Sequence, residues 1–212
     1  MPHTHQAMTA MFRLVRHAAH DSLGRVLTGR SPGFELSQEG REQARLLARK
    51  LSGQFDLVCS SPQTRARETA EILAGSTGVP LEISGALDEI DFGEWSGKAF
   101  TELETAAAWQ QWNEARHLTS TPAGETMADV AKRVLGLMEE LRHEHPGAAI
   151  ALVSHADVIK AAVCRCLGLG FDRMHSFEVS PASVTTMALG DWGGALLALN
   201  EHAGGFWREG DG

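Results

Sequence analysis

Short apolar runs rich in β-branched residues alternate along the chain with longer segments of helical periodicity. The clearest runs cover residues 11–15, 55–59 and 148–153, and a segment with helical spacing follows each of them. Such alternation is typical of α/β proteins with a largely parallel sheet. We therefore predict three strands of one parallel sheet from these runs.

Three segments carry an apolar stripe at helical spacing, and they cover residues 37–51, 126–142 and 157–167. The second begins with Thr126 and Asp129, whose spacing resembles a capping box. A fourth helix is expected after Pro62, because that residue closes the second strand. These segments predict the helices that cover the sheet.

Two other regions break the simple alternation. The late apolar runs at residues 177–179, 184–189 and 195–199 have no long helix between them, which predicts hairpin or edge pairing. Residues 96–122 are rich in Ala and Trp and show no strand signal, so we expect a small helical insertion that can lie over a site.

The predicted fold is α/β, a three-layer α/β/α arrangement with a mostly parallel sheet and that insertion. Residues 1–10 show no periodicity and are expected to form a loose arm, and the Gly-rich residues 203–212 a flexible tail. Residues 11–202 are then expected to form a single domain, a size that one hydrophobic core can support.

Composition narrows the function. The net charge of −8 argues against nucleic acid and anionic membranes as partners, and no apolar run is long enough to span a bilayer. We expect a cytoplasmic protein, since no secretory apolar stretch precedes the first strand. Cys59, Cys164 and Cys166 are odd in number and lack paired-ligand spacing, so neither disulfides nor a zinc site is predicted, and no cofactor is expected.

Polar residues follow the predicted parallel strands at the point where each ends. Arg16 and His17 follow the first strand, and His155 follows the third. Because the carboxyl ends of parallel strands face one crevice, these side chains should meet there, and Arg65 lies one turn into the helix after Pro62. Two arginines and two histidines would repel each other unless an anion lay between them. Arginine matches phosphate oxygens and histidine is a capable nucleophile, so the cluster predicts phosphoryl transfer.

The sequence around these residues resembles the histidine phosphatase superfamily, a phosphoglycerate mutase-like group. Leu14-Val15-Arg16-His17 is similar to its opening signature, and Val153-Ser154-His155 to its second histidine. Residues 60–70 and 87–97 resemble two further motifs of the family. Weaker matches are residues 36–44 and Gly124-Glu125-Thr126. The matches follow the family order from about Phe12 to Leu189. An Arg-His pair alone would mean little, but several motifs in the same order indicate a real relationship.

The resemblance implies a metal-independent phosphatase that works through a phosphohistidine. By it, His17 attacks phosphorus, Arg16, Arg65 and His155 hold the non-bridging oxygens, and Glu89 serves as the proton donor. The chemistry is reasonable on its own terms, because phosphoryl transfer needs positioning and charge stabilisation above all. His17 must be neutral to attack, so a backbone carbonyl should accept a hydrogen bond from its other ring nitrogen.

The chain departs from the family pattern at two places. Leu23 stands where the family commonly has a phosphate-binding Asn, and Ala156-Asp157 where two glycines are frequent. We hypothesise that His20 or Asp157 takes over part of the missing contact, because each lies beside a motif histidine. Arg30, in the turn Thr28-Gly29-Arg30-Ser31-Pro32, is a further candidate for substrate binding or a plain turn residue.

Three other functions remain open at this stage. The same residues suit a phosphoglycerate-type mutase, although the insertion is short for an enclosing lid. A metal-dependent hydrolase built from His17, His20, Asp21, His155 and Asp157 is the second, and a non-catalytic phospholigand sensor is the third. The small phosphorylated substrate and the oligomeric state are not determined by the sequence, because specificity lies in the insertion and in residues 24–34.

Overall fold

The computed structural model describes residues 9–204, so most of the predicted N-terminal arm and C-terminal tail lies outside the described residues. A six-stranded sheet with the order β3-β2-β4-β1-β5-β6 runs through the molecule. Its strands are β1 (Ala10–Arg16), β2 (Leu57–Ser60), β3 (Leu81–Ile83), β4 (Ala149–Ser154), β5 (Val184–Gly190) and β6 (Gly193–Glu201). β1 to β4 are mutually parallel, whereas β5 is antiparallel to β1 and forms a hairpin with β6. The largely parallel sheet and the late hairpin are both confirmed.

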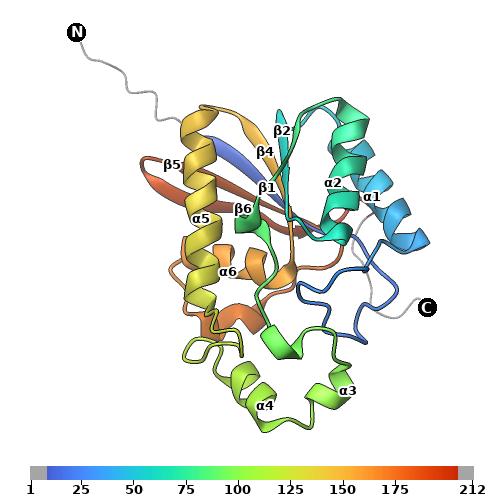
Figure 1. The fold of residues 1–212 in the computed structure, drawn as a ribbon. Helices are drawn as coiled ribbons and strands as arrows, with labels where there is room; N and C mark the ends of the chain where they lie inside the picture. The colour runs from blue at the N-terminus through green and yellow to red at the C-terminus, as the bar shows by residue number, and fades with distance from the viewer. Residues whose placement is uncertain (1–8, 205–212) are drawn as a thin grey trace.

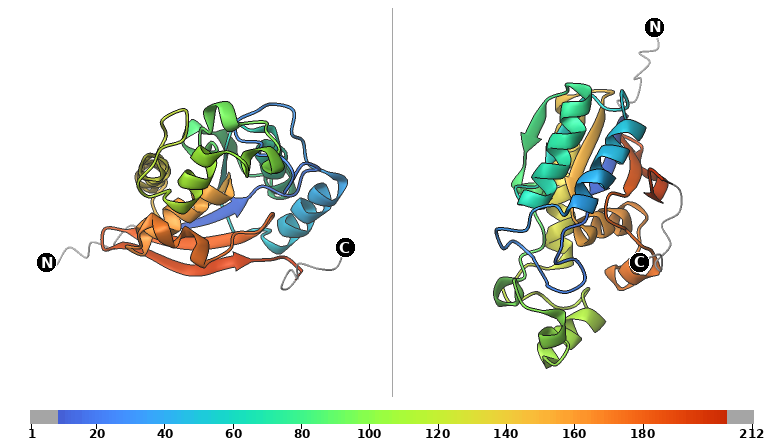
Figure 2. Two further views of the ribbon diagram at one scale, coloured as in Figure 1. Left: turned by 90° about the horizontal axis from the view of Figure 1, so that it is seen from below. Right: turned by 90° about the vertical axis from the view of Figure 1, so that its right-hand side faces the viewer.

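Helices cover both faces of this sheet, as Figures 1 and 2 show. They are α1 (Gln38–Lys50), α2 (Thr64–Thr77), α5 (Met127–Glu144) and α6 (Ala156–Cys166), with the short α3 (Phe100–Leu103) and α4 (Ala107–Glu114) between. α1 and α2 pack on one face with Val58, Ala151 and Val153, while α5 and α6 pack on the other with Phe12 and Leu152. The predicted three-layer α/β/α fold is confirmed.

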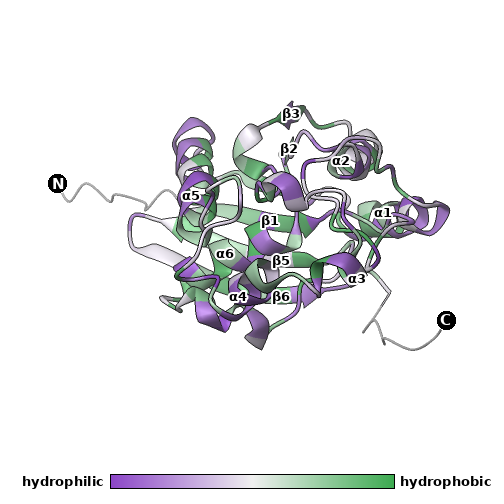
Figure 3. Ribbon diagram, turned by 60° about the horizontal axis from the view of Figure 1, so that its bottom comes forward, coloured by the Kyte–Doolittle hydropathy of each residue, from purple (hydrophilic) through white to green (hydrophobic). Residues whose placement is uncertain are grey.

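Local sequence explains where the main helices begin. Ser37 caps α1 by accepting from the Gly40 backbone N–H, and Thr126 and Asp129 form a reciprocal capping box at the start of α5. Each of the main helices buries an apolar stripe against the sheet and turns a mostly hydrophilic face to solvent, a division visible in Figure 3. None of the helices within residues 9–204 is long and apolar enough to cross a bilayer.

One strand prediction was wrong, and one strand was missed. Residues 177–179 form no strand, because the Val179 carbonyl accepts from the Arg16 side chain instead of pairing in the sheet. β3 was not predicted, since it has only three residues and two of them, Glu82 and Ile83, are exposed at the sheet edge. Neither segment lies among the strands that carry the candidate site.

The predicted insertion contains α3 and α4 and lies at the lower end of the molecule in Figure 1. Its core is aromatic: Trp109 and Trp112 are buried and stack at a ring-centroid distance of 5.5 Å, and both pack against Phe92 and Trp95. Phe92 and Trp95 belong to the segment that follows Glu89. The insertion is therefore tied by packing to the loop that carries the predicted acid.

Candidate active site

The loop after β1 is anchored by both helices on one face of the sheet. The backbone N–H of Ala18 donates to Thr69 Oγ1 at 3.0 Å, and Ser37 donates to the Ala19 carbonyl through its backbone N–H at 3.0 Å. A Cβ on Gly40 would lie 1.9 Å from the Ala19 oxygen, so only glycine lets α1 approach so closely. This anchoring fixes the residue between β1 and Ala18, which is His17.

His17 is held as a neutral ring whose Nε2 is unprotonated. Its Nδ1 lies 2.9 Å from the Ala18 carbonyl, and only an N–H can donate there, so Nε2 carries the lone pair. Arg65 Nε donates to that Nε2 at 3.2 Å. Burial lowers the pKa of His17 well below its usual value, and the charges of Arg65 and Arg16 lower it further. The expected carbonyl partner is confirmed, and Nε2 is available as a nucleophile.

Two guanidinium groups converge beside this ring. Arg65 is 1% exposed and donates to the Gly29 carbonyl at 2.8 Å, while Arg16 donates to the Val179 carbonyl at 2.7 Å. Arg65 Nη1 and Arg16 Nε are buried without a hydrogen-bond partner among residues 9–204. A buried donor without an acceptor is costly, so both N–H groups are suited to an anion that enters from the cavity.

His155 lies directly after β4 and is fully buried. Its ring centroid is 5.2 Å from that of His17, and its Nδ1 is 3.1 Å from Arg65 Nη2. Its Nε2 is 2.8 Å from Ser61 Oγ. Burial, and next the charge of Arg65, lower the pKa of His155 well below its usual value. The structure thus brings together Arg16, His17, Arg65 and His155, the four residues expected to meet at the strand ends.

Glu89 reaches the same point from the loop between β3 and the insertion. Its carboxylate Oε2 lies 3.7 Å from His155 Nδ1, and its side chain is 13% exposed. Burial, and next the charge of Asp157, raise the pKa of Glu89 to about 7 against the opposing charge of Arg65. A carboxyl group with such a pKa can both give and take a proton near neutral pH.

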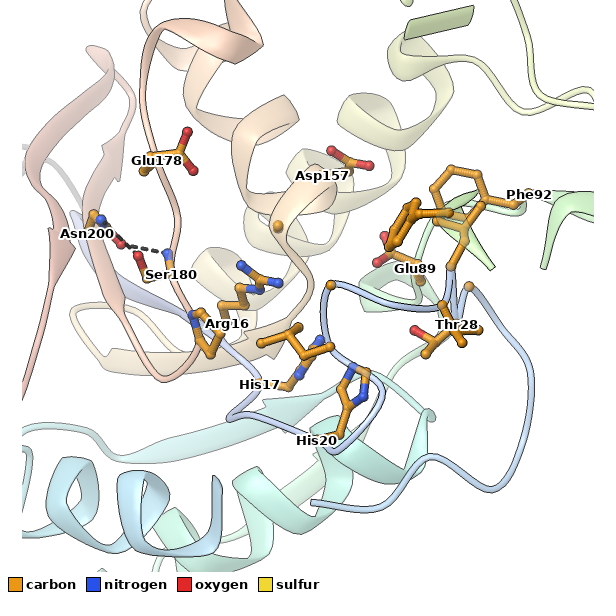
Figure 4. A pocket seen from close by; sticks show the side chains of 18 of the residues that line it. Arg16, His17, His20, Thr28, Glu89, Phe92, Asp157, Glu178, Ser180 and Asn200 are labelled. Atoms are coloured by element: carbon orange, nitrogen blue, oxygen red, sulfur yellow. Dashed lines mark hydrogen bonds between the residues drawn. The ribbon is translucent and has the colours of Figure 1, made fainter. Parts of the chain in front are cut away.

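Arg16, His17 and Glu89 line a cavity of about 860 Å³, shown in Figure 4. Arg65 and His155 contact His17 without being part of that lining. In this view Arg16 and His17 lie near the centre, with Glu89 to their right and Asp157 above them. The wall includes residues 26–29, Phe92 and Phe100, so the loop of residues 24–34 and the insertion both contribute, as expected.

The candidates beside the two histidines both line this cavity. His20 is 5% exposed, its ring centroid lies 5.6 Å from that of His17, and its Nδ1 is buried without a partner within residues 9–204. Burial, and next the charge of Arg65, lower the pKa of His20 to about 4, so its ring is neutral at pH 7. Asp157 is bound by Arg116 of the insertion, with Nη1 to Oδ1 at 2.8 Å. Their part in substrate binding stays a prediction.

Arg30 does not line the cavity. Its Nε donates to the Glu89 carbonyl at 2.8 Å, and its Nη atoms lie 3.3 Å from the Asp91 carboxylate and 3.2 Å from that of Glu125. The structure therefore places Arg30 behind the loop that carries Glu89, in a position to support the loop.

Sequence reasoning missed Ser61, Arg116 and Arg133. Ser61 follows β2 as His17 follows β1, so the strand-end rule was a usable signal for it. Arg116 and Arg133 make their contacts with loops far away in sequence, and no pattern near either residue indicated a role.

The alternative metal site is not assembled. Within residues 9–204, no group of three or more His, Cys, Asp or Glu side chains is arranged to hold a metal ion. The two guanidinium groups beside His17 and His155 would also repel a divalent cation. The arrangement instead offers a neutral nucleophile, donors for an anion, and a carboxyl group that titrates near pH 7.

Comparison with known proteins supports the same chemistry. The sequence profile of the histidine phosphatase superfamily (branch 1) matches residues 12–202. Phosphoserine phosphatase 1 of Hydrogenobacter thermophilus is 32% identical over 203 residues, which cover 92% of this chain and 95% of that protein. A phosphoserine phosphatase of Entamoeba histolytica, solved in complex with phosphoserine, superposes with a TM-score of 0.80 at 26% identity and covers 90% and 96% of the two chains. A mycobacterial glucosyl-3-phosphoglycerate phosphatase superposes with a TM-score of 0.81 at 27% identity over 91% and 99%.

Proposed function

The chain belongs to the histidine phosphatase superfamily, branch 1, and we propose that it hydrolyses small phosphate monoesters with His17 as the nucleophile and Glu89 as the proton donor. That it is a phosphoric monoester hydrolase follows from its family and from relatives named as phosphatases over nearly their whole length. The assignment of roles to residues rests on the geometry. The observation that carries it is the pair of buried guanidinium N–H groups, without a partner among residues 9–204, beside the unprotonated Nε2 of His17.

In the first proposed step, His17 Nε2 forms a bond to phosphorus while the bond from phosphorus to the ester oxygen breaks. The proton of Glu89 passes to that leaving oxygen, so the alcohol departs neutral. Arg16 and Arg65 donate to the non-bridging oxygens, where negative charge is concentrated. The Ala18 carbonyl stabilises the cationic ring that results, because it accepts from Nδ1.

In the second step, the Glu89 carboxylate takes a proton from water as the water oxygen bonds to phosphorus. The bond from His17 to phosphorus breaks, inorganic phosphate leaves, and both residues return to their starting protonation states. His155 supports both steps, since its Nδ1 accepts from Arg65 Nη2 and so helps to hold the guanidinium that binds the phosphoryl oxygens.

The proposed substrates are small phosphorylated metabolites that fit the cavity, and the relatives named above act on phosphoserine and glucosyl-3-phosphoglycerate by their names. We propose further that residues 11–202 act as one domain, that no metal takes part, and that the protein works in the cytoplasm, where its three free thiols stay reduced.

The test is phosphate release from a panel of monoesters in excess chelator, with phosphoserine, 3-phosphoglycerate, sugar phosphates and nucleoside monophosphates as substrates. We expect turnover that the chelator does not affect. Loss of turnover on chelation would indicate a metal hydrolase, isomerisation of phosphoglycerate faster than phosphate release would indicate a mutase, and tight phosphate binding without turnover would indicate a sensor.

The pH dependence should respond to Asp157. Glu89 must be protonated in the first step, so kcat/KM is expected to fall as pH rises through its pKa of about 7. The negative charge of Asp157 raises that pKa, so Asp157→Asn should move the basic limb of the profile to lower pH by about half a unit or more.

Arg116→Gln is the matched control for Asp157→Asn, because it breaks the same ion pair but leaves the carboxylate charge in place. Its basic limb should stay or move to higher pH. A basic limb that moves the same way in both variants would show that the ion pair, and not the charge of Asp157, sets the pKa of Glu89.

A further inference from the structure

The backbone of the segment that carries Glu89 is held by charged side chains from elsewhere in the chain. Residues 89–92 belong to no helix or strand. Arg30 Nε donates to the Glu89 carbonyl at 2.8 Å, and Arg133 Nη2 donates to the same oxygen at 3.3 Å. Arg30 comes from the loop after β1 and Arg133 from α5, so one donor precedes Glu89 in the sequence and the other follows it.

Glu125 joins the two arginines. Its Oε2 accepts from Arg30 Nη2 at 3.2 Å and from the backbone N–H of Asp91 at 2.7 Å, and its Oε1 accepts from Arg133 Nε at 2.8 Å. Arg133 Nη1 also donates to the Ala86 carbonyl at 2.8 Å. The side chains of Glu125 and Arg133 are 14% and 19% exposed, so solvent screens these contacts only in part.

The contacts of the two arginines and Glu125 fix the backbone and do not involve the carboxyl group of Glu89. Neither arginine forms an ion pair with the Glu89 side chain, and Arg30, Glu125 and Arg133 do not line the cavity. Two further N–H groups of the segment are also bound, Glu89 N–H by Asp88 Oδ1 at 2.8 Å and Ile90 N–H by Glu89 Oε1 at 2.9 Å. The three outer residues can therefore act on the reaction only through Glu89, by its position or, in the case of Arg133, by a charge that lowers its pKa.

We propose that Glu125 is a positioning residue which, through Arg30 and Arg133, holds Glu89 in place for proton transfer to the leaving oxygen. The inference rests on the proposed role of Glu89 and adds three residues that do not touch substrate. A carboxyl group on an irregular segment has no helix or strand to orient it, so the ion-paired cluster takes that part. Misplacement of a reacting group by about 1 Å can cost about 100-fold in rate.

The test compares two esters whose leaving groups differ in their need for a proton. An alkyl phosphate needs general acid assistance, whereas p-nitrophenyl phosphate releases a stable anion. The measured constant is kcat/KM, because it covers the steps only as far as departure of the leaving group. Glu125→Gln should lower kcat/KM for the alkyl ester by about 10- to 100-fold, and for p-nitrophenyl phosphate by less than about threefold.

Asp129→Asn is the control for a general loosening of this region. Asp129 caps α5 four residues after Glu125, and within residues 9–204 its hydrogen bonds go to Thr126 and not to the Glu89 segment, so this variant should leave the ratio between the two esters unchanged. Arg133→Lys should reproduce the selective loss, because one ammonium group cannot reach Glu125, Ala86 and Glu89 together.

Glu89→Gln provides the reference. If it loses the alkyl ester selectively and Glu125→Gln does not, either because both esters fall equally or because neither changes, the positioning role is overturned while the function stands. If Glu89→Gln itself affects both esters equally, the acid role of Glu89 fails and the inference fails with it. The nucleophile is tested separately at His17.

Discussion

His17→Ala is expected to lower phosphate release by at least about 10⁴-fold, the largest loss of any substitution in the chain. The variant removes the atom that forms the bond to phosphorus, and no other side chain can replace it. His155 is the nearest ring, at 5.2 Å between centroids, but its Nδ1 is bound by Arg65, and His20 lies farther away at 5.6 Å. The measurement is steady-state phosphate release with the best ester of the panel.

His143→Ala is the matched control, since His143 is exposed on α5 and contacts only Glu139 and Arg142. It should keep the parent rate. The covalent step can be observed directly: rapid quenching of the parent with labelled ester should trap an acid-labile, base-stable phosphoenzyme that His17→Ala does not form. Residual turnover of the variant within about 100-fold of the parent would rule out His17 as the nucleophile.

Four residues of the site were predictable because a simple topological rule places them. Arg16 is the last residue of β1, and His17 and His155 directly follow β1 and β4, which are neighbours and parallel in the sheet. Arg65 follows from the same rule, since it is the second residue of α2, the helix after β2. The weaker family-like match at residues 36–44 also acquires a physical reason, because Ser37 and Gly40 hold the loop after His17.

What sequence reasoning could not provide are contacts between irregular segments. The cluster around Glu89 joins Arg30 to Glu125 and Arg133, which come about a hundred residues later in the chain and share no periodicity with it. Arg30 illustrates the difficulty, since a turn arginine near the site is chemically suited to bind substrate and equally suited to support the loop. Only the positions of its acceptors distinguish the two roles.

Arg65 is the residue whose replacement should cost most after His17. Its guanidinium donates to His17 Nε2, to the Gly29 carbonyl and toward His155 Nδ1, and Nη1 remains for a phosphoryl oxygen. Lysine keeps the charge but concentrates it on one atom, so it cannot hold this planar set of partners and the anion at once. Arg65→Lys is therefore expected to lower kcat/KM by about 10²- to 10³-fold, together with weaker inhibition by phosphate and vanadate.

Arg67→Lys is the matched control for Arg65→Lys. It lies two residues later on α2, is exposed, and pairs only with Glu71, so kcat/KM should not change. A second variant, Arg65→Met, removes the charge that lowers the pKa of His17 and His155, so both values should rise in an NMR titration. If Arg65→Lys kept more than about a third of the parent kcat/KM, the fork geometry of Arg65 would be unnecessary, and charge alone would account for phosphate binding. If the pKa of His17 stayed unchanged in Arg65→Met, burial alone would keep the nucleophile neutral, and the arginine would act on the phosphoryl group and not on the ring.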